Sequence, residues 1–84
     1  MYEIVFSQDA EKYFKKLEKE LQKRIINSLE RIKVLPLSYI ERLVGLNYYK
    51  LRVGDYRIII DLKQDKMVIF IIKIGHRKDI YKDL

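Results

Sequence analysis

A hairpin pattern near the middle of the chain constrains the fold more than any other stretch of the sequence. Residues 50–57, Lys-Leu-Arg-Val-Gly-Asp-Tyr-Arg, alternate charged and apolar side chains on both sides of a Gly-Asp pair. Such alternation is typical of half-buried strands, and a Gly-Asp pair favours a tight turn between them. Side chains two positions apart share one face of a sheet, so the face opposite the core carries Lys50, Arg52 and Arg57. This cationic face predicts an anionic partner.

Apolar spacing in the first half of the chain predicts one strand and two helices. Residues 2–6 alternate as a strand does. Ser7 is placed to cap a helix that runs to about residue 18, with acidic residues in the first turn, where the helix dipole favours them. A second helix is predicted from residue 19 or 20 to Leu35, because apolar side chains recur at helical spacing and Pro36 ends the pattern.

Three consecutive strands are predicted in the second half, after a loop at residues 37–46. They cover about residues 47–53, 56–62 and 67–74. The elements follow the order β-α-α-β-β-β, which predicts a single α+β domain over residues 1–84. In this domain an antiparallel four-stranded sheet has the helix pair packed on one face.

The last predicted strand is apolar on both faces over its first half. Alternation places Val68, Phe70, Ile72 and Ile74 on one face, and Met67, Ile69, Ile71 and Lys73 on the other. The helices can cover only one of these faces. The other needs a cover, either from the loop at residues 37–46 or from another polypeptide.

Composition narrows the class of protein. A chain of 84 residues has room for one domain. It has no cysteine, which excludes disulfides and thiolate metal sites and fits a reducing cytosol, and its lone histidine does not complete a ligand set. We therefore expect no metal and no cofactor. Without a basic, apolar leader or an apolar stretch long enough for a bilayer, we expect a cytoplasmic protein with no membrane partner.

The net charge of +6 is unevenly distributed. Residues 1–45 contain nine Lys and Arg against seven Asp and Glu, whereas residues 46–84 contain nine against five. A basic surplus on the predicted sheet is typical of a nucleic-acid footprint. Charge that serves solubility alone explains the surplus equally well.

The order and spacing of these motifs resemble the RelE/ParE superfamily of toxins from toxin–antitoxin modules, and the RelE branch in particular. The resemblance covers nearly the whole chain, from the opening strand and lysine-rich helix pair, through Glu-Arg-Leu-Val-Gly and the hairpin, to Ile-Ile-Lys-Ile-Gly-His-Arg-Lys-Asp-Ile-Tyr. It implies a RelE-like, microbial ribonuclease-type fold. It also implies a ribosome-dependent endoribonuclease that cuts messenger RNA in the ribosomal A site, and a cognate RelB-type antitoxin that wraps the toxin in a hetero-oligomer.

The same resemblance implies the positions of the functional residues. The catalytic set falls on Lys50, Arg57, Arg77 and Tyr81. Arg52 aligns with a basic position nearby, and we predict that Tyr48, Arg52, Lys73, His76 and Lys78 bind RNA. Two positions depart from the family pattern, because Tyr48 replaces an early strand lysine of the best-known members and His76 stands where a lysine can occur.

RNA cleavage without a metal requires side chains that move protons and stabilise the phosphorane charge. Arginine suits the charge role, because its planar fork donates two hydrogen bonds to phosphate and stays protonated. Arg57 and Arg77 are the candidates; the alternatives are an ion pair of Arg57 with Asp61 and a solvated tail position for Arg77. Lys50 either grips the RNA backbone or acts as a base, if crowding by Arg52 and Arg57 lowers its pKa.

The aromatic candidates have alternatives as well. Tyr81 stacks on a base or relays a proton, or else it clips the tail to the sheet. Tyr48 is placed to stack on RNA, whereas Tyr49 faces the core. His76 has an unperturbed pKa near neutrality, which suits acid–base catalysis, but counting from Phe70 places it on the core-facing side.

A second function from another class competes with the nuclease. ParE-type toxins of the superfamily are not enzymes but bind and poison DNA gyrase. Members of that type generally lack the full catalytic set, which is present here, so the endoribonuclease is the leading hypothesis. A third alternative is a decayed module that retains only antitoxin binding.

Overall fold

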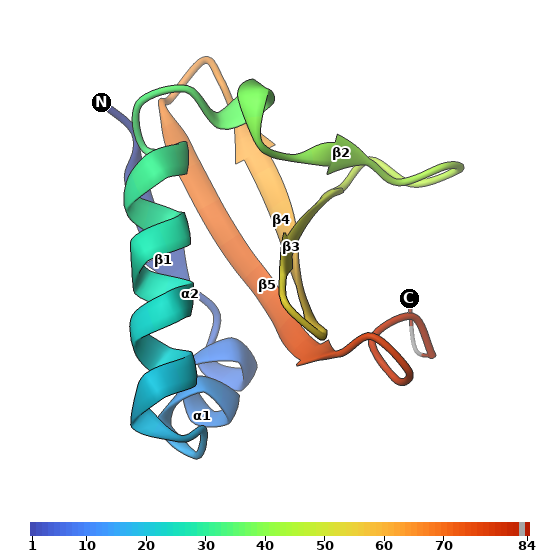
Figure 1. Ribbon diagram of the computed structural model, residues 1–84. Helices are drawn as coiled ribbons and strands as arrows, with labels where there is room; N and C mark the ends of the chain where they lie inside the picture. The colour runs from blue at the N-terminus through green and yellow to red at the C-terminus, as the bar shows by residue number, and fades with distance from the viewer. Residues whose placement is uncertain (83) are drawn as a thin grey trace.

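Two helices pack on one side of a curved sheet, and the C-terminal tail lies on the other side (Figure 1). The computed structural model describes residues 1–82 and 84. The predicted α+β class is confirmed. The elements are β1 (Glu3–Phe6), α1 (Gln8–Lys15), α2 (Lys19–Ile32), a 3-10 turn (Pro36–Ser38), β2 (Glu41–Arg42), β3 (Tyr49–Val53), β4 (Tyr56–Lys63) and β5 (Val68–His76).

The sheet has five strands in the order β1-β5-β4-β3-β2. Strands β2 to β5 pair antiparallel, but β1 runs parallel to β5. The prediction of four antiparallel strands was therefore wrong in these two details. Period-two alternation identifies a strand without giving the direction of its neighbour, and the two residues of β2 are too few to alternate.

Ser7 links the first helix to the sheet. Its Oγ accepts a hydrogen bond from the Ala10 N–H at 3.0 Å, as predicted for an N-cap, and donates one to the Ile72 carbonyl at 2.8 Å. The helix that it caps ends at Lys15, about one turn earlier than predicted.

The second helix begins at Lys19, as predicted, but ends at Ile32 rather than Leu35. Pro36 excludes the residue before it from helical geometry, and Leu35 has φ −135° and ψ 74°. Lys33 still has helical geometry as the C-cap, and the Val34 N–H makes a turn contact of 3.4 Å to the Arg31 carbonyl. The helix thus ends three residues before the predicted end, and the proline accounts only for the non-helical geometry of Leu35.

The main core lies between α2 and the helix-side face of the sheet. Close packing of branched side chains from both layers excludes water, which is the principal stabilising contribution in a domain of this size. Its central members are the buried residues Ile25, Leu29, Ile32, Leu51, Val53, Ile58, Ile60, Ile69, Ile71 and Ile74.

A β-bulge in β5 makes the predicted facing of its first half wrong. Ile60 pairs with Ile71 and Ile59 pairs with Lys73, so Ile72 has no partner in β4. The extra residue switches the alternation. Before the bulge, Ile69 and Ile71 face the helices; after it, Ile74 does, and Lys73 moves to the opposite face.

That opposite face, here called the outer face, is partly covered by the tail. Ile80 is fully buried although it is not part of the core under the helices. A Cβ atom built on Gly75 would lie 3.0 Å from Ile80 Cδ1, so the isoleucine packs directly on the glycine. The sequence suggested that the loop at residues 37–46 or another polypeptide covers the second face of β5. At Gly75 this cover comes instead from Ile80 of the tail. The described helices are too short or too polar to span a lipid bilayer.

Candidate functional site

Two rows of residues cross the outer face of the sheet. In one row, Arg52 of β3 pairs with Arg57 of β4, which pairs with Gly75 of β5. In the next row, Lys50 pairs with Ile59, and Ile59 with Lys73. The bulge in β5 puts Lys73 in register with the hairpin cations, so three strands contribute positive charge to one face.

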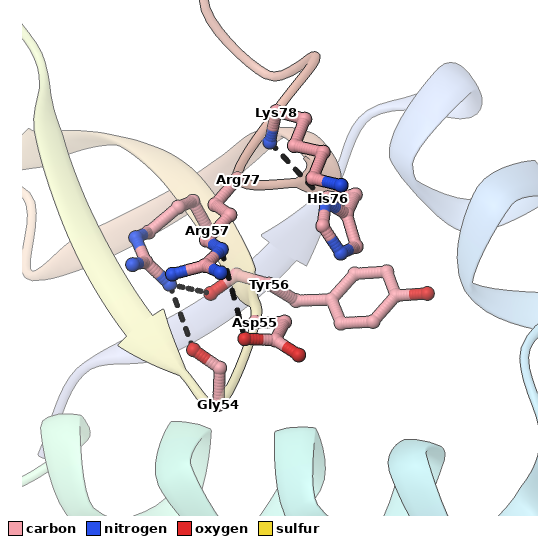
Figure 2. Close-up of polar contacts among 7 residues, drawn as sticks. All are labelled: Gly54, Asp55, Tyr56, Arg57, His76, Arg77 and Lys78. Carbon is pink, nitrogen blue, oxygen red and sulfur yellow. Dashed lines mark hydrogen bonds and ion pairs between the residues drawn. The ribbon is translucent and has the colours of Figure 1, made fainter.

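The β3–β4 turn gathers two arginines from distant parts of the chain (Figure 2). Arg57 Nη1 donates hydrogen bonds to the carbonyls of Gly54 (2.9 Å) and Tyr56 (2.8 Å). The Arg77 N–H donates to the Asp55 carbonyl at 2.8 Å, and Arg77 Nε lies 3.7 Å from Asp55 Oδ1. The first residue of the tail, Arg77, thereby meets the turn at the centre of the hairpin.

These contacts leave most of both guanidinium forks available to a ligand. A guanidinium has five N–H donors, and the described carbonyls engage only Nη1 of Arg57. In the described chain, Asp61 does not pair with Arg57; its Oδ2 lies 3.4 Å from Lys63 Nζ. Arg77 is half-exposed and is tethered to Asp55 rather than fully solvated.

Lys50 is half-buried at the edge of the same face. Its Nζ lies 4.0 Å from Glu41 Oε2 of β2, which is itself well exposed. Exposed ion pairs at this distance contribute little to stability. Glu41 is therefore the closest described carboxylate to Lys50, and it holds the ammonium loosely.

His76 lies away from the cations, on the helix side of the sheet. Its ring contacts Tyr56 edge-on, with ring centres 5.4 Å apart, and Nδ1 accepts a hydrogen bond from the Lys78 N–H at 3.2 Å. Figure 2 shows these two rings on one side of the strands and the two guanidinium groups on the other. Burial beside Tyr56 raises the pKa of Tyr13 of α1, which also neighbours His76 and Asp79. This tyrosine stays protonated at neutral pH.

The tail begins at Arg77 beside the β3–β4 turn and continues through Lys78 to Tyr81. It is a series of tight turns, in which the N–H groups of Asp79 and Ile80 both donate to the His76 carbonyl, at 2.9 and 3.0 Å. Ile80 is buried and Tyr81 is 45% exposed, so the isoleucine, rather than the tyrosine, clips the tail to the sheet.

The remaining candidates lie at the rim. Tyr48 is half-buried immediately before β3, and its carbonyl accepts a hydrogen bond from the Leu43 N–H at 2.9 Å. Lys78 is exposed, and its backbone N–H, rather than its side chain, makes the hydrogen bond to His76 that is drawn in Figure 2. The outer face therefore brings together Lys50, Arg52, Arg57 and Lys73, with Arg77 at the turn, while His76 is separated from them by the sheet.

Sequence reasoning missed the residues that support this face. Gly75 gives Ile80 the space to anchor the tail, and Glu41 reaches Lys50 from a strand of two residues. An apolar residue inside a charged tail was the available signal for the anchor. No signal in the sequence indicated Glu41, because its position depends on tertiary pairing.

The arrangement is suited to binding phosphate. Several cations converge without an equal number of carboxylates, and arginines are fixed so that part of each planar fork remains outward. The ammonium groups of Lys50 and Lys73 add positive charge on the same face. Such a face can hold a phosphodiester and stabilise additional negative charge on it.

Comparisons with known proteins agree with this geometry. Residues 4–81 match the family model described as the ParE toxin of type II toxin–antitoxin system, parDE. The chain is 30% identical to a chain of the RelB–RelE antitoxin–toxin complex from Methanococcus jannaschii, covering 95% of this chain and 98% of that one with a TM-score of 0.74. For the intact E. coli RelBE complex the values are 26% identity, 90% and 96% coverage, and 0.78.

A third structure supports the fold alone. The archaeal RelE–RelB complex from Pyrococcus horikoshii OT3 is 24% identical, with 93% of this chain and 97% of that chain covered and a TM-score of 0.80. A search of curated protein sequences found no match. Because the family model spans almost the whole chain and the fold is that of RelE, the chain belongs to the RelE/ParE superfamily of toxins from type II toxin–antitoxin modules.

Proposed function

We propose that this toxin is a metal-independent endoribonuclease that cuts messenger RNA on the ribosome and thereby inhibits translation. The RelE proteins that it resembles in fold and in sequence motifs are the basis for the reaction class. The proposal assigns the reaction to the outer face of the sheet. It assigns the cytoplasm as the place of action, because messenger RNA is translated there.

The observation that carries the proposal is the direct cross-strand pairing of Arg52 with Arg57. Like charges directly opposite each other on a sheet destabilise it. Within the described chain, neither arginine has a carboxylate within ion-pair distance, so the repulsion between them is not relieved by the protein. An RNA phosphate lying over this pair would relieve it.

In the proposed reaction, the 2′-hydroxyl oxygen of a nucleotide attacks its own 3′-phosphate. A bond forms between phosphorus and the 2′-oxygen, the bond to the 5′-oxygen of the next nucleotide breaks, and the products are a 2′,3′-cyclic phosphate and a 5′-hydroxyl. The proton of the 2′-hydroxyl goes to a base on the enzyme, and the leaving oxygen takes a proton from an acid. Arg57 and Arg77 stabilise the charge that develops on the phosphorane.

Lys50 and Tyr81 are the proposed proton-transfer groups. Lys50 lies on the outer face and Tyr81 directly follows Ile80, which packs on Gly75 of that face, whereas the imidazole of His76 packs on Tyr56 on the helix side. Tyr81, which is half-exposed, also stacks on a base. Arg52, Lys73 and Tyr48 bind RNA at the same face, and Lys78 binds it from the tail. His76 contributes to RNA binding only indirectly, through the position of Lys78.

We also propose a RelB-type antitoxin as the partner that blocks this activity. The Methanococcus jannaschii and E. coli relatives are both described in complexes with RelB. On this chain, Phe70 of β5 is 38% exposed on the outer face, which no helix of the described residues covers, and Met67, just before β5, is 44% exposed. An amphipathic helix would bury them, which is a common mode of peptide recognition.

Gyrase poisoning remains the second candidate, because the matching family model is that of ParE. The deciding experiment adds the purified toxin to a translating extract and, separately, to gyrase with supercoiled DNA. Loss of intact messenger RNA, without accumulation of cleaved gyrase–DNA complexes, is the expected result. Intact messenger RNA in the extract together with trapped gyrase–DNA complexes would contradict the proposal.

A further inference from the structure

A cationic hollow lies beyond the outer face, between α2 and the part of β3 that β2 does not pair with. Its volume is about 250 Å³. No acidic residue lines it, whereas hydroxyl, amide and guanidinium groups do. The lining residues are Arg24, Asn27, Ser28, Arg31, Arg52, Val53 and Gly54.

Arg24 crosses from the helix to the hairpin turn. A Cβ atom built on Gly54 would lie 2.9 Å from Arg24 Nη2 and 3.0 Å from Nη1, so the guanidinium rests directly on the glycine. Gly54 has φ +58°, in the left-handed region that favours glycine. One residue thus allows both the tight turn and the close approach of the arginine.

The charges of the hollow are not compensated within the described chain. In contrast to the arginines, Lys23 of α2 pairs with Glu20, and Lys33, just after α2, pairs with Glu30. None of the three arginines of the hollow has a described carboxylate within 4.0 Å, although Arg24 also lines a neighbouring pocket that contains Glu18, Glu20 and Asp55. Asp55 instead pairs with Arg77.

The hollow is open along the sheet edge. Strand β2 pairs with β3 only at Tyr49 and Lys50, which leaves the edge from Leu51 to Val53 without a partner strand in the described chain. Arg52 belongs to both surfaces, because it lines the hollow and pairs with Arg57 on the outer face. A continuous positive path therefore runs from the outer face around β3 to α2.

We propose that this hollow is a second phosphate-binding site, which holds a phosphodiester of the RNA backbone several nucleotides away from the bond that is cut. Arg24 and Arg31 donate bidentate hydrogen bonds to the phosphate oxygens, and Ser28 and Asn27 add neutral donors. The assignment of RNA as the source of the phosphate rests on the proposed function.

The test measures binding of a fluorescent, fully 2′-O-methylated single-stranded RNA by anisotropy over a range of salt concentrations. The methyl groups prevent attack by the 2′-oxygen, so failure of the proposed cleavage does not affect this measurement. The variant is Arg24→Ala/Arg31→Ala, two exposed helix positions that tolerate alanine. The control, Lys12→Ala/Lys19→Ala, removes the same charge from exposed helix positions outside the hollow.

The expected result is a loss of affinity of about tenfold for the arginine variant at low salt, with a slope of log K against log salt that is shallower by about 1.4. Arg24→Lys/Arg31→Lys should restore the slope but not the affinity, because lysine keeps the charge without the planar fork. Circular dichroism melting establishes that each variant is folded.

Three results would overturn the assignment. The first is that the arginine variant and the control bind RNA equally well. The second is full recovery of affinity by the lysine variant, which would mean a diffuse positive field rather than a site. The third combines two observations: the wild type and the arginine variant bind the RNA equally, and inorganic phosphate at constant ionic strength raises the melting temperature of the wild type but not of the arginine variant. This result would assign the hollow to free phosphate.

Discussion

At the scale of single residues, the outer face combines unfavourable electrostatics with fixed geometry. Arg52 and Arg57 are direct cross-strand partners, and the Arg57 guanidinium is held by two carbonyls of the adjoining turn. Neither feature is needed for folding, because the core lies on the opposite face. Residues that lower stability without contributing to the packing of the fold are expected where a charged ligand binds.

Replacing Arg52 with glutamine should therefore stabilise the free protein. The expected gain is about 0.2–0.5 kcal/mol in the free energy of unfolding at low salt, because a like-charge pair is removed. The gain should largely disappear at about 1 M salt, where the Debye length is about 3 Å. Urea denaturation of the wild type, Arg52→Gln and the surface control Lys12→Gln gives the comparison, and a lower stability of Arg52→Gln at low salt would contradict the explanation.

At the scale of secondary structure elements, two connections determine where the site forms. The bulge at Ile72 turns Lys73 toward the hairpin cations, and the anchor of Ile80 on Gly75 holds the tail against the sheet. Arg77 and Tyr81 flank that anchor in the sequence. The tail is therefore the element whose order the site depends on most.

Ile80→Ala should release the tail while the domain stays folded. The loss of a fully buried isoleucine side chain is expected to cost about 2 kcal/mol, at the low end for core truncations because the tail is peripheral. In Ile80→Ala, the amides of Asp79 and Ile80, which donate to the His76 carbonyl, should exchange faster than they do in the wild type. The exchange of the core amides of β4 should change less.

The matched control for the anchor is Leu84→Ala, an exposed apolar residue of the same tail. It should change neither the exchange of these amides nor the stability. Equal effects of the two substitutions, or unchanged exchange in Ile80→Ala, would show that Ile80 does not anchor the tail.

Several elements were predictable from the sequence because local rules determine them. The cap at Ser7 and the hairpin at Gly54 follow from side-chain hydrogen bonding and from the left-handed turn, and both were confirmed. The direction of β1 and the bulge at Ile72 were not predictable. Both depend on which strand lies alongside and where, which alternation along one strand does not encode.

The bulge also explains how far the site was predictable. Strict alternation from Lys50 placed Lys50, Arg52 and Arg57 together, and the structure has them on one face. Strict alternation from Phe70 gave the wrong faces for the first half of β5, yet it placed His76 on the helix side, where it lies. The hollow at Arg24 could not be predicted, because it joins a helix and a turn that are 30 positions apart in the sequence.

At the scale of the whole molecule, the chain combines a small core with a net charge of +6 and apolar side chains left at the surface. Val44 is fully exposed in the loop between β2 and β3, and Met67 and Phe70 are partly exposed at the other end of the sheet. A domain of this size buries a limited share of its surface, so added contacts with a partner have a large effect on its stability.

The antitoxin complex should therefore be markedly more stable than the free toxin. Antitoxin at a hundredfold excess over its Kd should raise the free energy of unfolding by about 2.7 kcal/mol, since it binds only the folded state. Thermal melting of the free chain and of the complex with the antitoxin of the same module measures the difference. A free chain that is monomeric and melts at the same temperature as the complex would contradict the role of the uncovered surface.

The most direct test of the central claim maps the 5′ ends of messenger RNA on translating ribosomes treated with the toxin. The wild type should produce codon-phased cuts with 5′-hydroxyl ends. Arg57→Ala and Arg77→Ala should each reduce the cleavage rate by about a hundredfold or more, as expected for loss of a group that stabilises transition-state charge. The control Arg42→Ala, a cation of β2 that contacts Asn47 rather than the turn, should cleave as the wild type does. Undiminished cutting by both arginine variants, or no cutting by the wild type, would contradict the account.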